Sequence, residues 1–164
     1  MNLTAMEVDV QFACRDTGLP SKMDIQEMVE FAANQSGRMP DGDADVAVRV
    51  VDTAEIQALN KRYRDKDVPT NVLSFPAGPM DGLPGDAARQ LGDIVVCAPV
   101  VGEEAAQQGK SLGDHWAHML VHGVLHLLGY DHENSADADE MERLEAAILN
   151  DRGIANPYAS IQVR

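Results

Sequence analysis

The sequence predicts a single α+β domain built around one small mixed sheet. Its 164 residues are 45% hydrophobic, which suits one domain with a sizeable core. Strand-like and helical segments follow one another in the order β-α-β-α-β-β-α-α-α. Because no internal repeat or linker divides the chain, we expect one domain over residues 1–164. It should contain a four-stranded sheet packed with about five helices.

The four strands are recognised by alternating or continuous apolar residues between turn-forming residues. Pro69 and Pro76 bracket the third strand, and the fourth is fully apolar. The segment 77–91 is rich in Gly, Pro and Asp, so we expect a long loop there. The strands are expected at residues 7–13, 46–51, 71–75 and 94–97.

The helices are recognised by apolar stripes at helical spacing and by capping residues. Asp114 is expected to cap the fourth helix, and Tyr63 to lie on the buried face of the second. The helices are expected from Ser21 to Gly37, from Asp52 through Tyr63, from Pro99 to Gly109, from Asp114 to Gly129, and over 135–151.

Charge is distributed unevenly along the chain. The net charge of −14 argues against a general nucleic-acid coat protein and against binding to anionic membranes. Residues 133–145 contain six acids, which we interpret as a solvated helix face. Four of the thirteen cationic residues lie within six positions, and a cluster of this kind can bind RNA phosphates. These are Lys61, Arg62, Arg64 and Lys66.

The sequence predicts a cytoplasmic protein that does not enter a membrane. It has no basic N-terminal region followed by an apolar core, and no run approaches 18 apolar residues. Cys14 and Cys97 are far apart and lie at the ends of apolar runs, which favours buried free thiols in a reducing compartment.

All five histidines fall within residues 114–132. His122 and His126 are four apart and therefore share one helix face. Gly129 can end the helix in the left-handed conformation and let His132 return towards them. Three imidazoles in this pattern suit one tetrahedral Zn²⁺ with its fourth position open to water. Histidines of a core or surface without metal are the alternative, but three converging imidazoles would then leave buried nitrogens unpaired.

The spacing H-x-x-x-H-x-x-G-x-x-H matches the metzincin metalloprotease signature with one departure. Gly123 stands where the peptidase has its glutamate base, so peptidase activity is not expected. The motif as a whole, from His122-Gly123 through Leu125-His126-Leu127 to Gly129-Tyr130-Asp131-His132, resembles the YbeY family of bacterial endoribonucleases. Residues 59–75 and the Leu-Gly-Asp-Ile segment 91–94 are also similar to that family.

This resemblance implies a zinc-dependent, single-strand-specific endoribonuclease with one Zn²⁺ per chain. It would act in ribosomal RNA maturation at the 3′ end of the small-subunit RNA and in ribosome biogenesis and quality control. Its partners would be single-stranded RNA and the ribosome or its small subunit, and its fold a four-stranded sheet packed with helices. Two alternatives stay open: a metzincin-like protease, and a non-catalytic ribosome-assembly factor with a structural zinc.

The candidate roles follow from the chemistry of phosphodiester cleavage. Arg64 matches the functional arginine of the family, and a guanidinium can hold two phosphoryl oxygens. Lys61, Arg62 and Lys66 are candidates for binding further phosphates. Asp131 and His118 are candidates for orienting a metal ligand or touching substrate.

Overall fold

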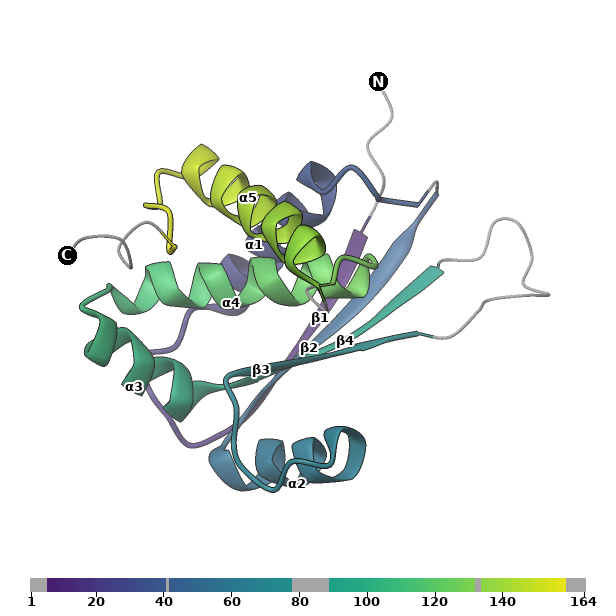
Figure 1. The fold of residues 1–164 in the computed structure, drawn as a ribbon. Coiled ribbons are helices and arrows are strands. Elements are labelled where there is room, and N and C mark those ends of the chain that lie inside the picture. Colours follow the sequence, from purple (N-terminus) through teal and green to yellow (C-terminus); the bar gives the residue numbers. More distant parts are fainter. Residues whose placement is uncertain (1–5, 41, 78–88, 132–133, 159–164) are drawn as a thin grey trace.

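Alternating hydrophobic residues produce a mixed four-stranded sheet in the computed structural model, which describes residues 6–40, 42–77, 89–131 and 134–158 (Figure 1). The strands are β1 (Met6–Ala13), β2 (Ala44–Val51), β3 (Val72–Pro76) and β4 (Arg89–Cys97). Their order in the sheet is β1-β2-β4-β3. Strands β1, β2 and β4 run parallel, with Val48 of β2 beside Ile94 of β4, whereas β3 runs antiparallel to β4, with Ser74 beside Ile94.

The described residues form five helices, most of which begin at a polar cap. The Ser21 hydroxyl accepts a hydrogen bond from Asp24 N, as expected. The fourth helix begins earlier than predicted, because Ser111 and not Asp114 is its N-cap. The helices are α1 (Lys22–Gln35), α2 (Thr53–Arg64), α3 (Ala98–Gln108), α4 (Leu112–Leu127) and α5 (Ser135–Asp151).

The helices cover the two faces of the sheet unequally. Helices α1 and α4 pack on one face, α5 lies beyond α4, and α2 lies on the opposite face (Figure 1). The larger core includes Val48, Ile94 and Trp116, and a smaller one under α2 includes Ile56 and Val95. The predicted α+β architecture is therefore confirmed.

Three further local predictions were wrong. Residues 89–91 belong to β4 and not to the loop, since they continue its pairing with β2; residues 78–88 of the expected loop lie outside the described part. Tyr63 is 53% exposed, because α2 meets the sheet through Ile56 and Leu59 instead. Both cysteines are free thiols, but only Cys97 is buried, and Cys14 is half-buried.

Helix α4 lies unusually close to the sheet at Gly123. A Cβ atom there would be 2.9 Å from Ile94 Cγ2 and 3.3 Å from Ser74 Oγ. The Ser74 hydroxyl donates a hydrogen bond to the Gly123 carbonyl across a distance of 3.0 Å. Glycine thus lets the histidine helix pack directly against the edge strand β3.

Candidate metal centre

Two of the predicted ligands lie side by side on α4. The ring centroids of His122 and His126 are 4.6 Å apart, with an angle of 79° between the rings. Both side chains are half-buried and line the same cleft. The i, i+4 spacing therefore places these two imidazoles on one face of the helix, as the sequence predicted.

The turn that follows α4 also agrees with the prediction. Gly129 adopts φ of +96°, and its N–H donates to the His126 carbonyl. The Tyr130 N–H donates to the Leu125 carbonyl, which completes a Schellman closure of the helix. The Tyr130 hydroxyl then donates to the Ser36 carbonyl at 2.7 Å, which holds the turn against α1. His132 itself lies outside the described residues, so its convergence on the pair stays a prediction.

A cleft of about 750 Å³ is lined by residues of α4, of β3 and of the segments next to them. It contains the two imidazoles, the guanidinium predicted to bind phosphate, and the carboxylate of Asp131. The lining residues are Arg64, Thr70, Asn71, Val72, Leu73, Ser74, Pro76, His122, His126, Gly129, Tyr130 and Asp131.

Arg64 is the last residue of α2, and its side chain reaches this cleft. The following residue, Asp65, closes the helix in the left-handed conformation with φ of 59°. The Arg64 Nη2 donates to the Ser74 carbonyl on β3 at 2.9 Å, and the guanidinium lies 5.5 Å from the centre of the Phe75 ring. Helix α2 and strand β3 together therefore aim one cation into the cleft.

The other three cationic residues of the cluster do not line the cleft. Lys61 lies 3.9 Å from Asp67, and the Arg62 guanidinium lies over the Tyr63 ring. Lys66 is exposed beyond the end of α2. Their role in binding RNA stays a prediction.

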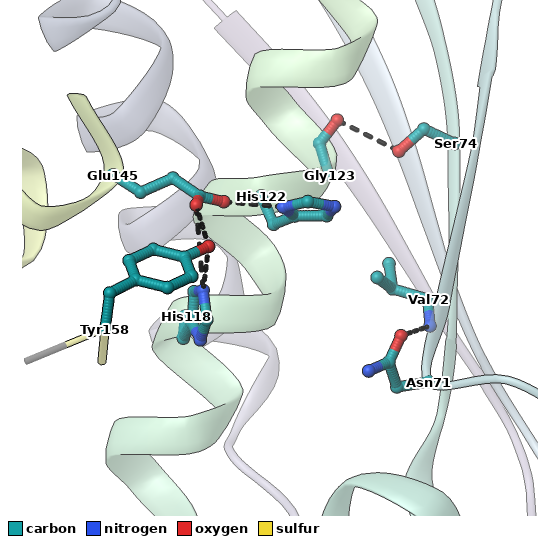
Figure 2. A network of polar contacts seen from close by, with 8 residues as sticks. All are labelled: Asn71, Val72, Ser74, His118, His122, Gly123, Glu145 and Tyr158. Carbon is teal, nitrogen blue, oxygen red and sulfur yellow. Dashed lines mark hydrogen bonds and ion pairs between the residues drawn. The ribbon is translucent and has the colours of Figure 1, made fainter. Parts of the chain in front are cut away.

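Glu145 on α5 is a site residue that the sequence interpretation missed. Its side chain is 0% exposed, and its Oε2 lies 2.6 Å from His122 Nδ1 (Figure 2). The interpretation of 133–145 as a solvated face was therefore wrong at this residue. A usable signal was its spacing, because Glu145 follows Met141 by four residues and precedes Ile148 by three, on the apolar stripe.

The other oxygen of Glu145 is held by Tyr158, from the segment after α5. The Tyr158 hydroxyl donates to Glu145 Oε1, and His118 Nε2 lies 3.3 Å from that hydroxyl (Figure 2). His118 thus faces this carboxylate network and does not line the cleft, which favours an orienting role over contact with substrate. Tyr158 was not predicted, because the tail has little sequence pattern.

The pKa values follow from this arrangement. Burial alone would raise the pKa of Glu145, but hydrogen bonds from His118, His122 and Tyr158 outweigh it and lower the pKa to about 2. Burial and the adjacent Glu145 carboxylate raise the pKa of Tyr158, so its hydroxyl stays protonated. The centre therefore contains a fully buried negative charge at neutral pH.

These features fit a metal ion at His122. An ionised carboxylate only accepts hydrogen bonds, so His122 donates its Nδ1–H to Glu145, and Nε2 is the nitrogen that could bind a metal. Metal-binding histidines are commonly held by a carboxylate in this way, and a cation would balance the buried charge. Within the described ranges no three His, Cys, Asp or Glu side chains gather as a metal site, and the predicted third ligand, His132, lies outside those ranges.

The family model for Endoribonuclease YbeY matches residues 14–153. The chain belongs to this family. Proteins named Endoribonuclease YbeY from Xanthomonas campestris pv. campestris (strain B100) and Stenotrophomonas maltophilia (strain R551-3) are 54% and 52% identical to it over 155 residues, which cover 94% of each chain. The resemblance seen in the histidine motif is thereby confirmed.

The fold agrees with a solved structure as well. The solution structure of a Thermotoga maritima protein matches with a TM-score of 0.53 and 26% sequence identity, over 88% of this chain and 91% of that one. The YbeY family match includes α4, α5 and β3, which supply the cleft and Glu145. Tyr158 lies beyond the end of that match.

The sequence left the role of His115 open. This residue lies near the start of α4, at the opposite end of the helix from His126. Its Nε2 is 2.9 Å from Glu104 of α3, and the Asn71 amide donates to the same carboxylate at 3.0 Å. Burial lowers the pKa of His115 despite the nearby Glu104. It therefore joins α4 and α3 to Asn71, which lines the cleft just before β3.

Proposed function

We propose that this protein is a zinc-dependent endoribonuclease that cuts single-stranded RNA during maturation of the small-subunit ribosomal RNA 3′ end and in ribosome quality control. The observation behind the proposal is one cleft that contains His122, His126 and Arg64 together. Membership of the YbeY family supports RNA as the substrate.

His122 and His126 would hold the zinc ion, with His132 as the expected third ligand. A zinc ion with an open coordination position supplies a Lewis acid and an activated water. Glu145, by accepting the Nδ1 proton of His122, would favour the tautomer whose Nε2 can bind the ion. One ion per chain is expected, because the five histidines provide a single set with this spacing.

Arg64 would bind and orient the phosphate that is cleaved. A guanidinium has five N–H donors in a planar fork, and the bond to the Ser74 carbonyl uses one of its terminal nitrogens and fixes the group against β3. The remaining donors suit the oxygens of a phosphodiester, whose negative charge must be stabilised as the bond breaks. Asp131 lines the same cleft and is a candidate for moving a proton or orienting a ligand.

The protease alternative is disfavoured by packing as well as by sequence. A side chain at position 123 would begin 2.9 Å from Ile94 and so would point into the sheet, where it cannot act as a base in the cleft. The assembly-factor alternative requires a zinc closed by four protein ligands. The open cleft beside His122 and His126 favours a site that accepts substrate.

The site of action would be the cytoplasm, on the small ribosomal subunit. Lys61, Arg62 and Lys66, the basic residues beside Arg64, are the candidate surface for the part of the RNA that extends beyond the cleft.

No helix among the described residues is both long and apolar enough to cross a bilayer.

The decisive experiment compares three substrates with the purified full chain. We expect cutting of an unstructured RNA oligonucleotide, little cutting of the same RNA in a perfect duplex, and no hydrolysis of casein. A chelator should stop cleavage, and added zinc should restore it. A chelator-sensitive casein activity without RNA cleavage would favour the protease, and zinc binding without either activity would favour the assembly factor.

A further inference from the structure

A continuous chain of hydrogen bonds connects the segment after α5 to His122. Tyr158 and Glu145 are joined by the phenol hydroxyl and Oε1, and Glu145 Oε2 contacts His122 Nδ1 at 2.6 Å (Figure 2). His118 Nε2 meets the same hydroxyl at 3.3 Å. The hydroxyl donates to the carboxylate, so it can accept the proton of His118 Nε2, and every donor in the chain then has one acceptor.

We infer that Glu145 and Tyr158 act as a positioning pair that sets the orientation and tautomer of His122 for metal binding. This inference rests on the proposed function, because it assumes that His122 binds zinc. Glu145 holds the imidazole directly. Tyr158 acts through it, because a hydroxyl bound to Oε1 fixes the rotation of the carboxylate and so the place of Oε2.

The burial of Glu145 supports this role over that of a simple tether for the tail. Glu145 is completely buried at the centre of α5, where an ionised group is costly unless it is fully hydrogen-bonded. Anchoring a tail would not require a charge at that depth. A carboxylate facing a metal-binding imidazole does require it, since the negative charge strengthens the imidazole as a ligand.

Zinc affinity of the full chain provides the test, measured by competition with a chromophoric chelator. We expect Glu145→Gln to weaken zinc binding roughly 10–100-fold, the usual range when the partner of a histidine ligand is changed. Tyr158→Phe should lower zinc affinity by about tenfold, at the lower end of that range, because Tyr158 contacts Glu145 and not the metal ligand itself. Glu140→Gln, at an exposed position of α5, and Tyr63→Phe, at an exposed tyrosine, are the matched controls and should bind as wild type does.

The double variant Glu145→Gln/Tyr158→Phe separates positioning from anchoring. If Tyr158 works through Glu145, the double variant should bind zinc no more weakly than Glu145→Gln alone. The visible spectrum of bound cobalt should also change in both single variants, since it reports ligand geometry. Unchanged zinc affinity in the single variants, or losses that simply add in the double variant, would overturn the inference.

RNA cleavage by wild type, measured on the same preparations, distinguishes this inference from the proposed function. If the wild-type protein binds zinc but does not cut RNA, the proposed endoribonuclease function is wrong. The inference about Glu145 and Tyr158 still holds in that case if their variants bind zinc more weakly. A wild-type protein that binds no zinc would overturn the pair as well.

Discussion

At the scale of single residues, Arg64 differs from its cationic neighbours in having a fixed place in the cleft. Its guanidinium is bound to the Ser74 carbonyl and lies against Phe75, whereas Arg62 lies over the exposed Tyr63 ring. The two arginines are two residues apart but have different surroundings. Replacing each of them with lysine therefore distinguishes the effect of guanidinium geometry from the effect of positive charge.

Arg64→Lys should slow RNA cleavage even though it keeps the positive charge. An ammonium is a compact charge and cannot both bond the Ser74 carbonyl and present a planar fork to phosphate. The loss of one aligned donor to a developing negative charge typically costs about 10²–10³ in rate. The measurement is cleavage of a single-stranded oligonucleotide by proteins matched for zinc content and melting temperature. Arg62→Lys is the control, and near-normal cleavage by Arg64→Lys would remove Arg64 from the catalytic assignment.

At the scale of elements, the close approach of α4 to the sheet sets the position of both imidazoles. That approach depends on Gly123, which has Ile94 and Ser74 in the space where a Cβ would be. Glycine normally weakens a helix interior, by about 1 kcal/mol relative to alanine. Its presence here in the middle of α4 is therefore explained by packing.

Gly123→Ala should destabilise the protein although alanine is the better helix former. Overpacking a tight contact typically costs about 1–3 kcal/mol, and a cost above the lower end of that range outweighs the gain of about 1 kcal/mol in helix propensity. Gly102→Ala in α3 is the matched control, because nothing lies within 4 Å of its Cβ position, and it should stabilise by about 0.5–1 kcal/mol. Urea unfolding of both variants measures the difference. Equal stabilisation by both would show that Ile94 and Ser74 give way without cost.

Local patterns predicted most of the elements and the side-by-side placement of the two candidate ligands on α4, because those features depend on residues close together in the sequence. The spacing of His122 and His126 and the Gly129 turn are of this kind, and both are confirmed. The YbeY resemblance rested on the same segment. Predictions were weaker wherever a partner distant in the chain decided the outcome.

Glu145 and Tyr158 illustrate that limit. Six acids between 133 and 145 made a solvated face the natural interpretation, and only the pairing of α5 with α4 reveals that one of them is buried. Tyr158 lies in a tail without periodicity, so its contact with Glu145 has no local signature. The start of β4 at Arg89 was missed for the same reason, since pairing with β2 extends the strand into a segment rich in glycine and proline.

At the scale of the whole molecule, the candidate metal centre joins segments far apart in the chain. Helix α4 supplies His122, α5 supplies Glu145, and the segment after α5 supplies Tyr158. The cleft adds α2 and β3 through Arg64 and Ser74. A metal bound by His122 would therefore favour the folded chain over the unfolded one, because only the folded chain assembles these groups.

Zinc should raise the melting temperature of the chelator-treated protein. Free zinc at about 100 times its Kd stabilises a single-site protein by about 2.7 kcal/mol. For a chain of this size each kcal/mol corresponds to roughly 2–4 °C, so a rise of roughly 5–11 °C is expected. The double variant His122→Ala/His126→Ala should show almost none of it. Calorimetry or circular dichroism melting measures the shift.

Magnesium is the necessary control in that experiment. A chain with a net charge of −14 repels itself when folded, so any divalent cation that gathers near the acidic surface stabilises it to some degree. Magnesium prefers oxygen ligands and should shift wild type and the double variant equally. Only the difference between zinc and magnesium, present in wild type and absent in the double variant, belongs to the imidazole site. A zinc shift of the same size in both proteins would mean that the ion binds elsewhere on the acidic surface, and the metal assignment for His122 and His126 would be wrong.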